Sequence, residues 1–254
     1  MSQFDEKVVI VTGASSGIGR AAAIAFAGQG AAVTIADVNA AGLRKVEQTI
    51  SSAGGRALAV ETDVSDVDAC EKMVAKTVEQ FGRLDVIFNN AAIVGQRAKT
   101  ADIPVDSWHQ VINVNLNGVF FCTRAAIPAM LESGGGVIVN TASVDGLVGM
   151  ASASHYTAAK HAVNGLTKCT ALEYAKQNIR CVAVAPGYIK TQMTKDAFNE
   201  EEDALITAMT PVGRAAEPEE VAEFVLWVAS DKASFVTGSV HQVDGAILAG
   251  FQLP

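Results

Sequence analysis

Seven short runs rich in valine and isoleucine recur along the chain, and longer segments with helical periodicity separate them. The runs cover residues 8–12, 32–36, 57–60, 86–88, 137–140, 181–185 and 240–243. Their near-continuous apolar character indicates strands that are covered on both faces, as in a parallel sheet between layers of helices. Strand and helix alternate along nearly the whole chain, which predicts an α/β fold with a doubly wound parallel sheet.

The helical segments between these runs cover residues 18–28, 40–53, 66–81, 108–130, 154–176 and 218–229. Asp66 is suited to cap the third of them, and Pro218 is suited to the first turn of the last. Pro128 falls late in the fourth segment, so we expect it to end or kink that helix.

One stretch, residues 191–217, breaks the alternation. It is polar and bounded by Pro186-Gly187 on one side and Pro211–Pro218 on the other. Long insertions in compact domains are often lids over an active site. We therefore expect a single domain over residues 1–254 with a lid at about residues 191–217.

Composition excludes several classes of protein. Hydrophobic residues make up 50% and charged residues 18% of the 254 residues, which is ordinary for a globular protein. The net charge is -8 and no basic run occurs, which argues against a nucleic-acid or anionic-membrane surface. The first apolar run is too short for a signal peptide, and no apolar stretch approaches the ~20 residues of a membrane span. Scattered cysteines indicate reduced thiols and a cytoplasmic location: Cys70, Cys122, Cys169 and Cys181.

A glycine-rich loop follows the first run, with the sequence Thr12-Gly13-Ala14-Ser15-Ser16-Gly17-Ile18-Gly19, and a helical segment follows the loop. Glycines allow a tight turn and a close backbone approach to a pyrophosphate, and the helix N-terminus offers free N–H groups. The spacing is G-x-x-x-G-x-G, and a glycine-rich turn without a ligand is the alternative.

Asp37 closes the second predicted strand. A carboxylate at that place can accept hydrogen bonds from both ribose hydroxyls of a dinucleotide, and it repels a 2′-phosphate. Neither Ser16 nor Val38, the neighbours that would hold such a phosphate, is basic. NAD is therefore the expected cofactor, although Asp37 could instead only begin the turn before Asn39.

Tyr156 and Lys160 form a Y-x-x-x-K pattern inside a helical segment, which places both side chains on one helix face. A neighbouring ammonium stabilises a phenolate and lowers the pKa of the phenol, so the pair is suited to proton transfer. An ordinary surface Tyr–Lys pair is the alternative. Ser143 ends a predicted strand, where open α/β sheets place ligands, and is suited either to donate to a substrate oxygen or to cap the strand.

Together these features resemble the short-chain dehydrogenase/reductases. The resemblance rests on residues 12–19, Asp37, Asn89-Asn90-Ala91, Asn115, Ser143, Tyr156-x-x-x-Lys160 and Pro186-Gly187, in the family's order and approximate spacing. It implies a Rossmann fold of about seven parallel strands with helices on both faces. It also implies reversible hydride transfer between NAD(P) and a small alcohol or ketone without a metal, in a homotetramer packed through helices such as residues 154–176.

The resemblance also assigns catalytic roles. Tyr156 would be the general acid/base, and Ser143 would position the substrate oxygen. Lys160 would hold the nicotinamide ribose and lower the pKa of Tyr156. Asn115 would anchor a water chain that relays the proton outward; its alternative is an amide satisfied inside its own helix.

The implied cofactor contacts follow from the same resemblance. Asp63 would meet the adenine, and Ile189 and Thr191 would bind the nicotinamide carboxamide. Ala92 departs from the family, which usually has glycine there; its methyl group is expected either to narrow the approach of the loop to the cofactor or, as a small group, to fit. The full set of expected cofactor contacts is Gly13, Ser16, Gly17, Ile18, Gly19, Asp37, Asp63, Val64, Asn90, Ala91, Tyr156, Lys160, Pro186, Gly187, Ile189 and Thr191.

Other polar residues have a weaker signal. The four histidines show no metal-ligand spacing, so we expect no metal site, and His155 is expected on a helix surface. Asp145 could either face the substrate or belong to a turn beside Gly146. The acidic residues 200–203 are expected to be a solvated, mobile segment. The apolar C-terminal residues 246–254 are expected to be buried against another subunit.

These inferences converge on an NAD-dependent dehydrogenase that interconverts a secondary alcohol and a ketone. A 3-oxoacyl-thioester reductase that uses NADPH is an alternative, and Asp37 argues against it. A non-catalytic dinucleotide-binding protein is a second alternative. The presence of all four expected catalytic residues argues against it: Asn115, Ser143, Tyr156 and Lys160. The sequence leaves the substrate open, but several expected wall residues suggest an apolar pocket for a cyclic or aromatic alcohol: Val94, Val144, Val148, Tyr188 and Met193.

Overall fold

The structure is a computed structural model that describes residues 2–250. Within that range seven strands form one parallel sheet in the order β3-β2-β1-β4-β5-β6-β7. Their bounds are β1 (Val8–Thr12), β2 (Ala32–Asp37), β3 (Arg56–Glu61), β4 (Val86–Asn89), β5 (Gly136–Thr141), β6 (Ile179–Pro186) and β7 (Val240–Val243). The predicted doubly wound Rossmann sheet is therefore confirmed.

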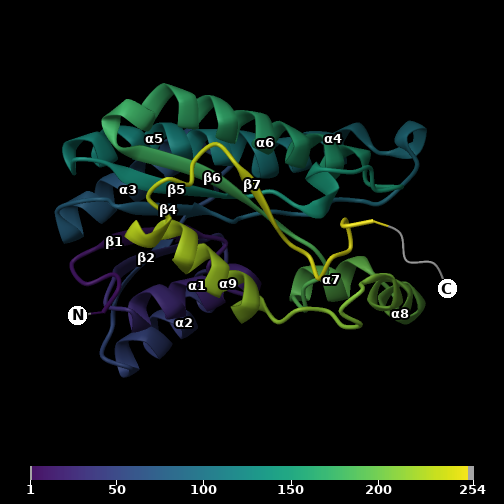
Figure 1. Cartoon of the computed structure of the whole chain (residues 1–254), viewed down its shortest axis with the longest axis horizontal. Helices are drawn as coiled ribbons and strands as arrows, with labels where there is room; N and C mark the ends of the chain where they lie inside the picture. Colours follow the sequence, from purple (N-terminus) through teal and green to yellow (C-terminus); the bar gives the residue numbers. More distant parts are fainter. Residues whose placement is uncertain (1, 251–254) are drawn as a thin grey trace.

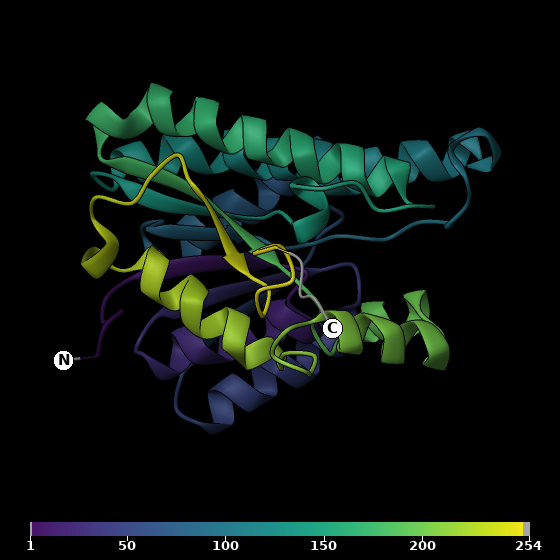
Figure 2. The same cartoon turned by 45° about the vertical axis from the view of Figure 1, so that its right-hand side comes forward.

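Helices cover both faces of the sheet (Figure 1). One layer holds α1 (Gly17–Gly28), α2 (Ala40–Ser52) and α9 (Pro218–Ala229). The other holds α3 (Val67–Phe81), α4 (Val105–Ile112), α5 (Gly118–Glu132) and α6 (Ser154–Tyr174). Two more helices, α7 (Gln192–Ala197) and α8 (Glu200–Met209), stand apart from both layers at one end of the sheet (Figure 2).

The strands are apolar on both faces because each face packs against a helix layer. In β1 all five residues are buried. Val9 and Val11 point into the core shared with Phe26 of α1, whereas Ile10 points into the core shared with Met130 of α5. Successive side chains of a strand alternate between faces, so a strand between two apolar cores has no polar position.

The order of the strands places a crevice beside β1. The chain passes from β1 to β2 and β3 on one side, and β4 then pairs with the other side of β1. Such a reversal separates the loops that leave neighbouring strands, and open α/β sheets bind ligands there, outside the carboxyl ends of the strands. Helices α7 and α8 lie at this end of the sheet (Figures 1 and 2).

Most helix boundaries agree with expectation. The Asp66 side chain caps α3 by accepting from the Asp68 N–H at 2.9 Å, and Pro218 begins α9. Pro128 does not end its helix, which was one of the two expected outcomes, because α5 continues to Glu132. Because proline has no N–H, the Arg124 carbonyl, one turn earlier in α5, receives no helical hydrogen bond from residue 128. The irregularity lies instead at Asn113–Asn117, a π-helical segment between α4 and α5.

The helical run Val105–Glu132 corrects a second expectation. It spans 28 residues and is long and apolar enough to cross a membrane, by length and composition alone. A core helix of a globular protein passes the same test. This run packs on α3 and α6 and on β4 and β5, which makes it part of a helix layer of the sheet.

The stretch at residues 191–217 contains regular structure. Residues 200–203, expected to be mobile, form the first turn of α8. Asn199 caps this helix: its side chain accepts from the Glu202 N–H at 2.9 Å, and its own N–H donates to the Glu202 carboxylate at 3.1 Å. This reciprocal cap stabilises a helix start that the acidic composition alone concealed. Of the apolar C-terminal segment, residues 251–254 lie outside the described residues.

Candidate active site

A hollow of about 300 Å³ opens at the carboxyl end of the sheet, beside β1. Most of the expected site residues line it: Gly13, Ser16, Gly17, Ile18, Asp37, Asn90, Ala91, Ser143, Tyr156, Lys160, Pro186, Gly187, Ile189 and Thr191. Four expected residues lie outside the lining: Gly19, Asp63, Val64 and Asn115. Six further lining residues were not among the expected catalytic residues or cofactor contacts, although Ala92 and Met193 were expected near the site: Ser15, Ala92, Thr141, Ala142, Met193 and Thr194. Most of these six are neighbours in sequence of expected residues, and this was the one signal in the sequence that could have identified them.

The glycine loop has the shape that a pyrophosphate requires. Gly13 and Gly17 have φ angles of 64° and 52°, in the left-handed region that favours glycine. A Cβ at Gly13 would lie 2.9 Å from the Cα of Ala91, and one at Gly19 would collide with the Gly13 carbonyl oxygen. Ser16 precedes α1 but its side chain makes no capping hydrogen bond. The first N–H groups of α1 are therefore available at the hollow, which suits an anion.

Asp37 both makes the turn after β2 and lines the hollow. Its Oδ2 accepts from the Ser15 N–H at 3.1 Å and its Oδ1 accepts from the Asn39 N–H at 2.9 Å. Each carboxylate oxygen keeps a second lone pair for a hydroxyl donor. Lys160 is the one cationic side chain in the lining within the described chain. The residues present thus suit a dinucleotide whose ribose hydroxyls meet Asp37.

Thr12 fixes the loop after β4. Its Oγ1 accepts from the N–H groups of Asn90 at 2.9 Å and Ala91 at 3.1 Å, and the Asn90 side chain donates to the Thr12 carbonyl at 3.0 Å. The buried Asn115 holds the next part of the loop, because its amide exchanges two hydrogen bonds with the backbone of Ile93, at 2.9 and 2.8 Å. The Asn115 amide is therefore satisfied by this loop and not within its own helix.

Three side chains meet where β5 and α6 approach each other. Ser143 follows β5 and Tyr156 lies in the first turn of α6, and both side chains line the hollow beside β1. Lys160, one turn later, donates from Nζ to the Thr141 carbonyl at 2.7 Å. The Lys160 Nζ lies 5.6 Å from the centre of the Tyr156 ring. The predicted Ser–Tyr–Lys neighbourhood is thus present.

Burial governs the protonation of this group. It raises the pKa of Tyr156 above its ordinary value; the charge of Asp145 adds to this rise, and the neighbouring Ser143 hydroxyl opposes it. Burial also lowers the pKa of Lys160 to about 8. We expected Lys160 to lower the pKa of Tyr156, but in the protein alone the change has the opposite sign. The loss of hydration disfavours the phenolate more than its surroundings stabilise it.

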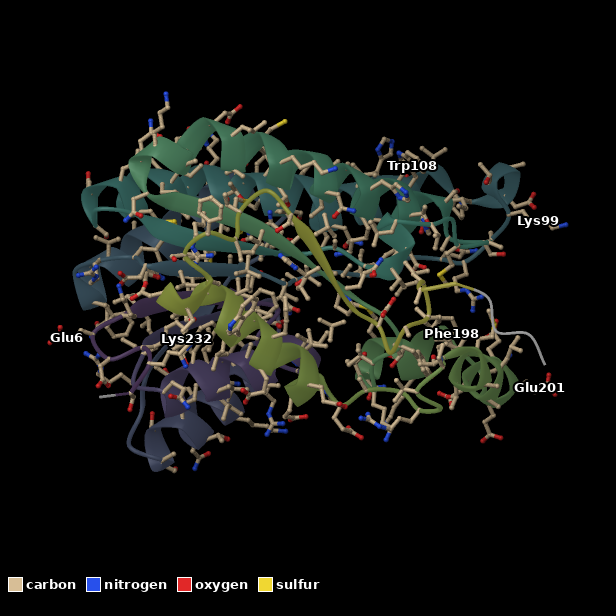
Figure 3. All side chains as sticks on the ribbon, viewed as in Figure 1. Glu6, Lys99, Trp108, Phe198, Glu201 and Lys232 are labelled. Atoms are coloured by element: carbon tan, nitrogen blue, oxygen red, sulfur yellow. The ribbon has the colours of Figure 1, made fainter. Side chains whose placement is uncertain are left out.

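A second hollow of about 380 Å³ adjoins the first and is largely apolar. Its wall includes Val94, Val144, Met150, Tyr188, Met193, Phe198, Ile206 and Met209. Phe198 comes from the segment between α7 and α8 and lies near the gap between these helices and the upper layer (Figure 3). The two hollows share Ser143 and Tyr156, so both hydroxyls lie at their junction. Val148, expected in this wall, is 44% exposed and lies outside it.

The structure decides the positions of two polar residues near the junction, His155 and Asp145. His155, expected on a helix surface, is fully buried, and its Nδ1 accepts from the Tyr156 N–H at 2.9 Å. It thereby satisfies an N–H of the first turn of α6, which periodicity could not reveal. Asp145 belongs to a turn and also faces the expected substrate side. Its N–H donates to Ser143 Oγ at 3.1 Å in a tight turn, and its side chain lines the apolar hollow.

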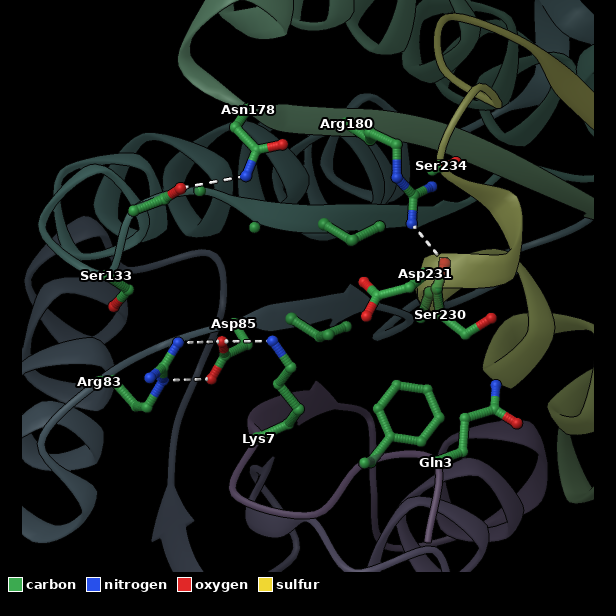
Figure 4. A pocket seen from close by; sticks show the side chains of 17 residues that line it. Gln3, Lys7, Arg83, Asp85, Ser133, Asn178, Arg180, Ser230, Asp231 and Ser234 are labelled. Carbon is green, nitrogen blue, oxygen red and sulfur yellow. Dashed lines mark hydrogen bonds and ion pairs between the residues drawn. The ribbon is translucent and has the colours of Figure 1, made fainter. Parts of the chain in front are cut away.

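A third hollow, of about 170 Å³, lies at the amino ends of the strands, far from this chemistry. Three of its charged side chains are paired: Asp85 forms ion pairs with Arg83 at 2.7 Å and with Lys7 at 3.4 Å (Figure 4). Arg180 donates to the backbone carbonyls of Val228 and Ser230. These contacts hold the strand ends and the α9 terminus together. Nowhere in residues 2–250 do three or more His, Cys, Asp or Glu side chains gather as a metal site would require.

Comparisons with known proteins agree with this geometry. Residues 13–247 match the family described as Enoyl-(Acyl carrier protein) reductase. Cyclohexanol dehydrogenase from Acinetobacter sp. (strain SE19) is 45% identical, with 96% of each chain covered. Meso-2,3-butanediol dehydrogenase from Serratia marcescens is 42% identical, with 97% of this chain and 96% of that protein covered.

A solved structure is similar over almost the full length. A short-chain type dehydrogenase/reductase from Mycobacterium marinum superposes with a TM-score of 0.93 at 35% identity, covering 98% of each chain. The sheet order, the glycine loop and the Ser143–Tyr156–Lys160 group match what the resemblance implied. The chain belongs to the short-chain dehydrogenase/reductase family.

Proposed function

We propose that this protein interconverts a secondary alcohol and a ketone, with NAD as the hydride carrier and Tyr156 as the general acid/base. One observation carries the proposal: the hydroxyls of Ser143 and Tyr156 lie at the junction of a polar, glycine-lined hollow and an apolar one. A cofactor in the first hollow and an alcohol in the second would meet at these hydroxyls.

The polar hollow supplies a place for each part of the dinucleotide. The N–H groups at the start of α1 would bind the pyrophosphate, and Asp37 would bind the adenosine ribose. Lys160 would hold the nicotinamide ribose, and Ile189 and Thr191 the carboxamide. Asp63 and Val64 would flank the adenine, since Asp63 follows Thr62, whose N–H donates to the Asp37 carbonyl at 3.0 Å. When bound, NAD accepts or returns the hydride of the substrate carbon.

The protein's own groups would move the proton. Ser143 would hold the substrate oxygen by a hydrogen bond while the Tyr156 phenolate takes the hydroxyl proton. Lys160, fixed on Thr141, would stabilise that phenolate electrostatically. Asn115 would anchor a chain of water molecules that carries the proton outward. Its backbone, or an amide group not used in the hydrogen bonds to Ile93, would contact the water.

The apolar hollow favours a compact, uncharged substrate such as a cyclic alcohol. Its volume of about 380 Å³ is at the small end of the range for ligand pockets. Helices α7 and α8 supply much of its wall, which supports their role as a lid within a single domain. The carboxylate of Asp37 argues against the NADPH-dependent 3-oxoacyl-thioester reduction, and the intact Ser143–Tyr156–Lys160 group argues against a non-catalytic binding protein.

We further propose a cytoplasmic homotetramer. Large apolar side chains are exposed on the helices of one layer, namely Val105, Trp108, Phe120 and Leu172. Trp108 stands on the outer side of that layer (Figure 3). Exposed apolar surface of this kind is suited to a contact between subunits. All four cysteines are free thiols, in keeping with a reducing compartment.

A panel of secondary alcohols tests the activity. Cyclohexanol and open-chain alcohols would be assayed with NAD⁺ and with NADP⁺ by the absorbance of the reduced cofactor, and cyclohexanone with NADH in reverse. We expect turnover with cyclic alcohols and NAD⁺. Absence of turnover with every alcohol and ketone, together with measurable NAD binding, would favour the non-catalytic alternative.

A further inference from the structure

Asp145 is the one charged side chain in the wall of the apolar hollow, as far as the described residues define that wall. It lies in the short 3₁₀ turn Val144–Gly146 that follows Ser143. The rest of the wall consists of aliphatic, aromatic and methionine side chains, a few small residues, and the hydroxyls of Ser143, Tyr156, Tyr188 and Thr194. A carboxylate in such a place is expensive unless something bonds to it.

Within residues 2–250 the Asp145 carboxylate has little hydrogen bonding. One donor reaches it, the Ser143 hydroxyl, with 3.4 Å between Oγ and Oδ2. That distance is long for an O–H···O bond, which is usually about 2.7–2.8 Å. An ionised carboxylate has about four acceptor positions, so the protein's own groups use little of its capacity.

No cation pairs with this carboxylate among the described residues. Lys160 and His161 act on Asp145 only through their charge at a distance, without an ion pair or a hydrogen bond. Lys160 is instead committed to Thr141. Burial consequently raises the pKa of the Asp145 carboxyl. A ligand with a hydrogen-bond donor at this point would supply the missing partner.

The other hydroxyls in the wall do not offer the same unused capacity. The Tyr188 hydroxyl donates to Asp203 of α8, and the Thr194 hydroxyl donates to the Ile189 carbonyl at 2.8 Å. Ser143 and Tyr156 are committed to the reacting oxygen under the proposed function. Asp145 is therefore the acceptor that remains for a second polar group of the substrate.

We propose that Asp145 is a specificity-determining residue that accepts a hydrogen bond from a second hydroxyl or amino group of the substrate. The preferred substrates are then cyclic diols or amino alcohols with the two groups on neighbouring carbons. Ser143 explains the spacing: its Oγ contacts the reacting oxygen and lies 3.4 Å from Asp145, so a donor beside the reacting carbon reaches the carboxylate. This inference rests on the proposed secondary-alcohol dehydrogenase activity and adds the substrate class to it.

The same charge excludes other substrates. A substrate carboxylate beside the reacting carbon would face Asp145 in a site of low dielectric constant, where like charges repel strongly. We therefore expect 2-hydroxycyclohexanecarboxylate to be a poor substrate for the unmodified protein and to improve when Asp145 is neutralised. An improvement with this substrate after neutralisation of Asp145 would show that the charge of Asp145, and not its size, excludes the substrate.

The test compares two substrates in the same variants. kcat/KM would be measured with NAD⁺ for cis-1,2-cyclohexanediol and for cyclohexanol in the unmodified protein, Asp145→Asn and Asp145→Ala. Both substrates use the same Tyr156, so the ratio of their kcat/KM values cancels any change in the pKa of that residue. Both variants keep the backbone N–H that donates to Ser143, which preserves the turn.

We expect the diol-to-cyclohexanol ratio to fall on the order of 10- to 100-fold in Asp145→Ala, the range for a hydrogen bond to a charged group, and less in Asp145→Asn. Asp102→Asn is the matched control: it neutralises an exposed carboxylate outside both hollows and should leave the ratio unchanged. With cationic 2-aminocyclohexanol, Asp145→Asn should raise KM more than it lowers kcat.

Two outcomes overturn the inference in different ways. If the unmodified protein oxidises cyclohexanol and the ratio is the same in all Asp145 variants, Asp145 has only its role in the turn and the proposed activity stands. If the unmodified protein oxidises neither substrate nor any other secondary alcohol, the proposed activity fails and the specificity role fails with it.

Discussion

The ammonium of Lys160 donates to the backbone carbonyl of Thr141, with 2.7 Å between Nζ and O, although the side chain is only 1% exposed. This bond joins α6 to the carboxyl end of β5. Because Tyr156 lies one turn earlier on the same helix, the bond also fixes the Tyr156 ring against Ser143. Burial lowers the pKa of Lys160 to about 8, so holding the charge there destabilises the folded state.

Lys160→Met tests whether activity and stability oppose each other at this residue. We expect kcat/KM to fall on the order of 10²-fold, because the phenolate of Tyr156 loses its nearest cation. The melting temperature at pH 7 should not fall. The pKa of Lys160 is lower in the folded state than the value of 10.5 it starts from, so its cost is complete below about pH 8 and disappears as the pH rises toward 10.5.

The difference in melting temperature between Lys160→Met and the unmodified protein should therefore be smallest at high pH. Thermal unfolding between pH 7 and 10 would measure it. Lys168→Met, on the exposed side of α6, is the matched control and should show no such pH dependence. A melting temperature for Lys160→Met several degrees below that of the unmodified protein at pH 7 would contradict this reasoning.

Tyr156→Phe tests the proton-transfer role. The variant keeps the buried ring but removes the hydroxyl, so kcat should fall at least about 10²-fold, the usual contribution of general acid–base catalysis, with NAD affinity little changed. Tyr174→Phe, at the other end of α6, serves as the control and should retain activity. Near-normal turnover of Tyr156→Phe would falsify the assignment.

The pH dependence of alcohol oxidation follows from the same residue. In the protein alone burial raises the pKa of Tyr156 above its ordinary value, so little phenolate exists at neutral pH. Oxidation should therefore rise with pH, and reduction of the ketone should fall. We expect the apparent pKa of kcat to lie below that of the phenol in the cofactor-free protein, titrated by ultraviolet difference absorbance. Equal values would mean that bound NAD⁺ contributes nothing to the ionisation.

Asp37 should determine the choice of cofactor. A 2′-phosphate would meet its carboxylate at close range, so the unmodified protein should use NAD⁺ far better than NADP⁺. Asp37→Ala should weaken NAD binding and narrow the ratio of the two kcat/KM values. Glu61→Ala removes the carboxylate paired in register with Asp37 on β3, which lies outside the hollow, and should change neither. Equal kcat/KM for both cofactors before any substitution would refute the prediction.

Arg97 should hold the proposed lid in place. Its guanidinium donates to the Ala197 carbonyl and to Glu202 at 2.9 Å each, and it lies 5.0 Å from the centre of the Phe198 ring. Arg97→Ala should speed hydrogen exchange across α7 and α8 and raise KM several-fold, since the ion pair is partly exposed and worth little by itself.

Arg124→Ala provides the control, because Arg124 forms an ion pair with Glu71 between α5 and α3, away from the lid. Binding of NAD and a substrate analogue should slow exchange in residues 192–209 of the unmodified protein. Equal exchange with and without these ligands would argue against a lid.

Phe120 offers a test of assembly. Its side chain is 46% exposed on α5, among the apolar side chains of that helix layer. Light scattering at micromolar concentration should report a homotetramer for the unmodified protein and smaller species for Phe120→Glu, which places a charge in the contact. Lys99→Glu, outside these helices, should not change the mass. A monomeric unmodified protein would rule the assembly out.

Several features followed from the sequence because they depend on neighbours along the chain. The bounds of β1 and β7 agree with the apolar runs that predicted them, and Asp66 caps α3 as its place before a helical segment implied. Glycine positions in the loop were equally local, since left-handed φ angles at Gly13 and Gly17 are a property of the backbone itself. The spacing of Tyr156 and Lys160 placed both on one helix face for the same reason.

Contacts between segments that are far apart in the chain could not be predicted from the periodicity of the sequence. The π-helical segment at Asn113–Asn117 and the burial of His155 depend on which loop packs against each helix. The exposure of Val148 was likewise set by the path of a turn. Capping of α8 was visible in the residues Asn199 and Glu202, but their acidic surroundings also suited an unfolded stretch.

The sequence by itself thus determined the sheet, the glycine loop and the residues that carry the chemistry, because short-range patterns encode strands, turns and helix faces. Only the tertiary structure decided their electrostatics. Burial of Tyr156 raises its pKa, which reverses the sign that the neighbouring lysine alone suggested, and burial lowers that of Lys160. The placement of Asp145 in an apolar wall was decided in the same way. Desolvation depends on everything packed around a group, and no local pattern records it.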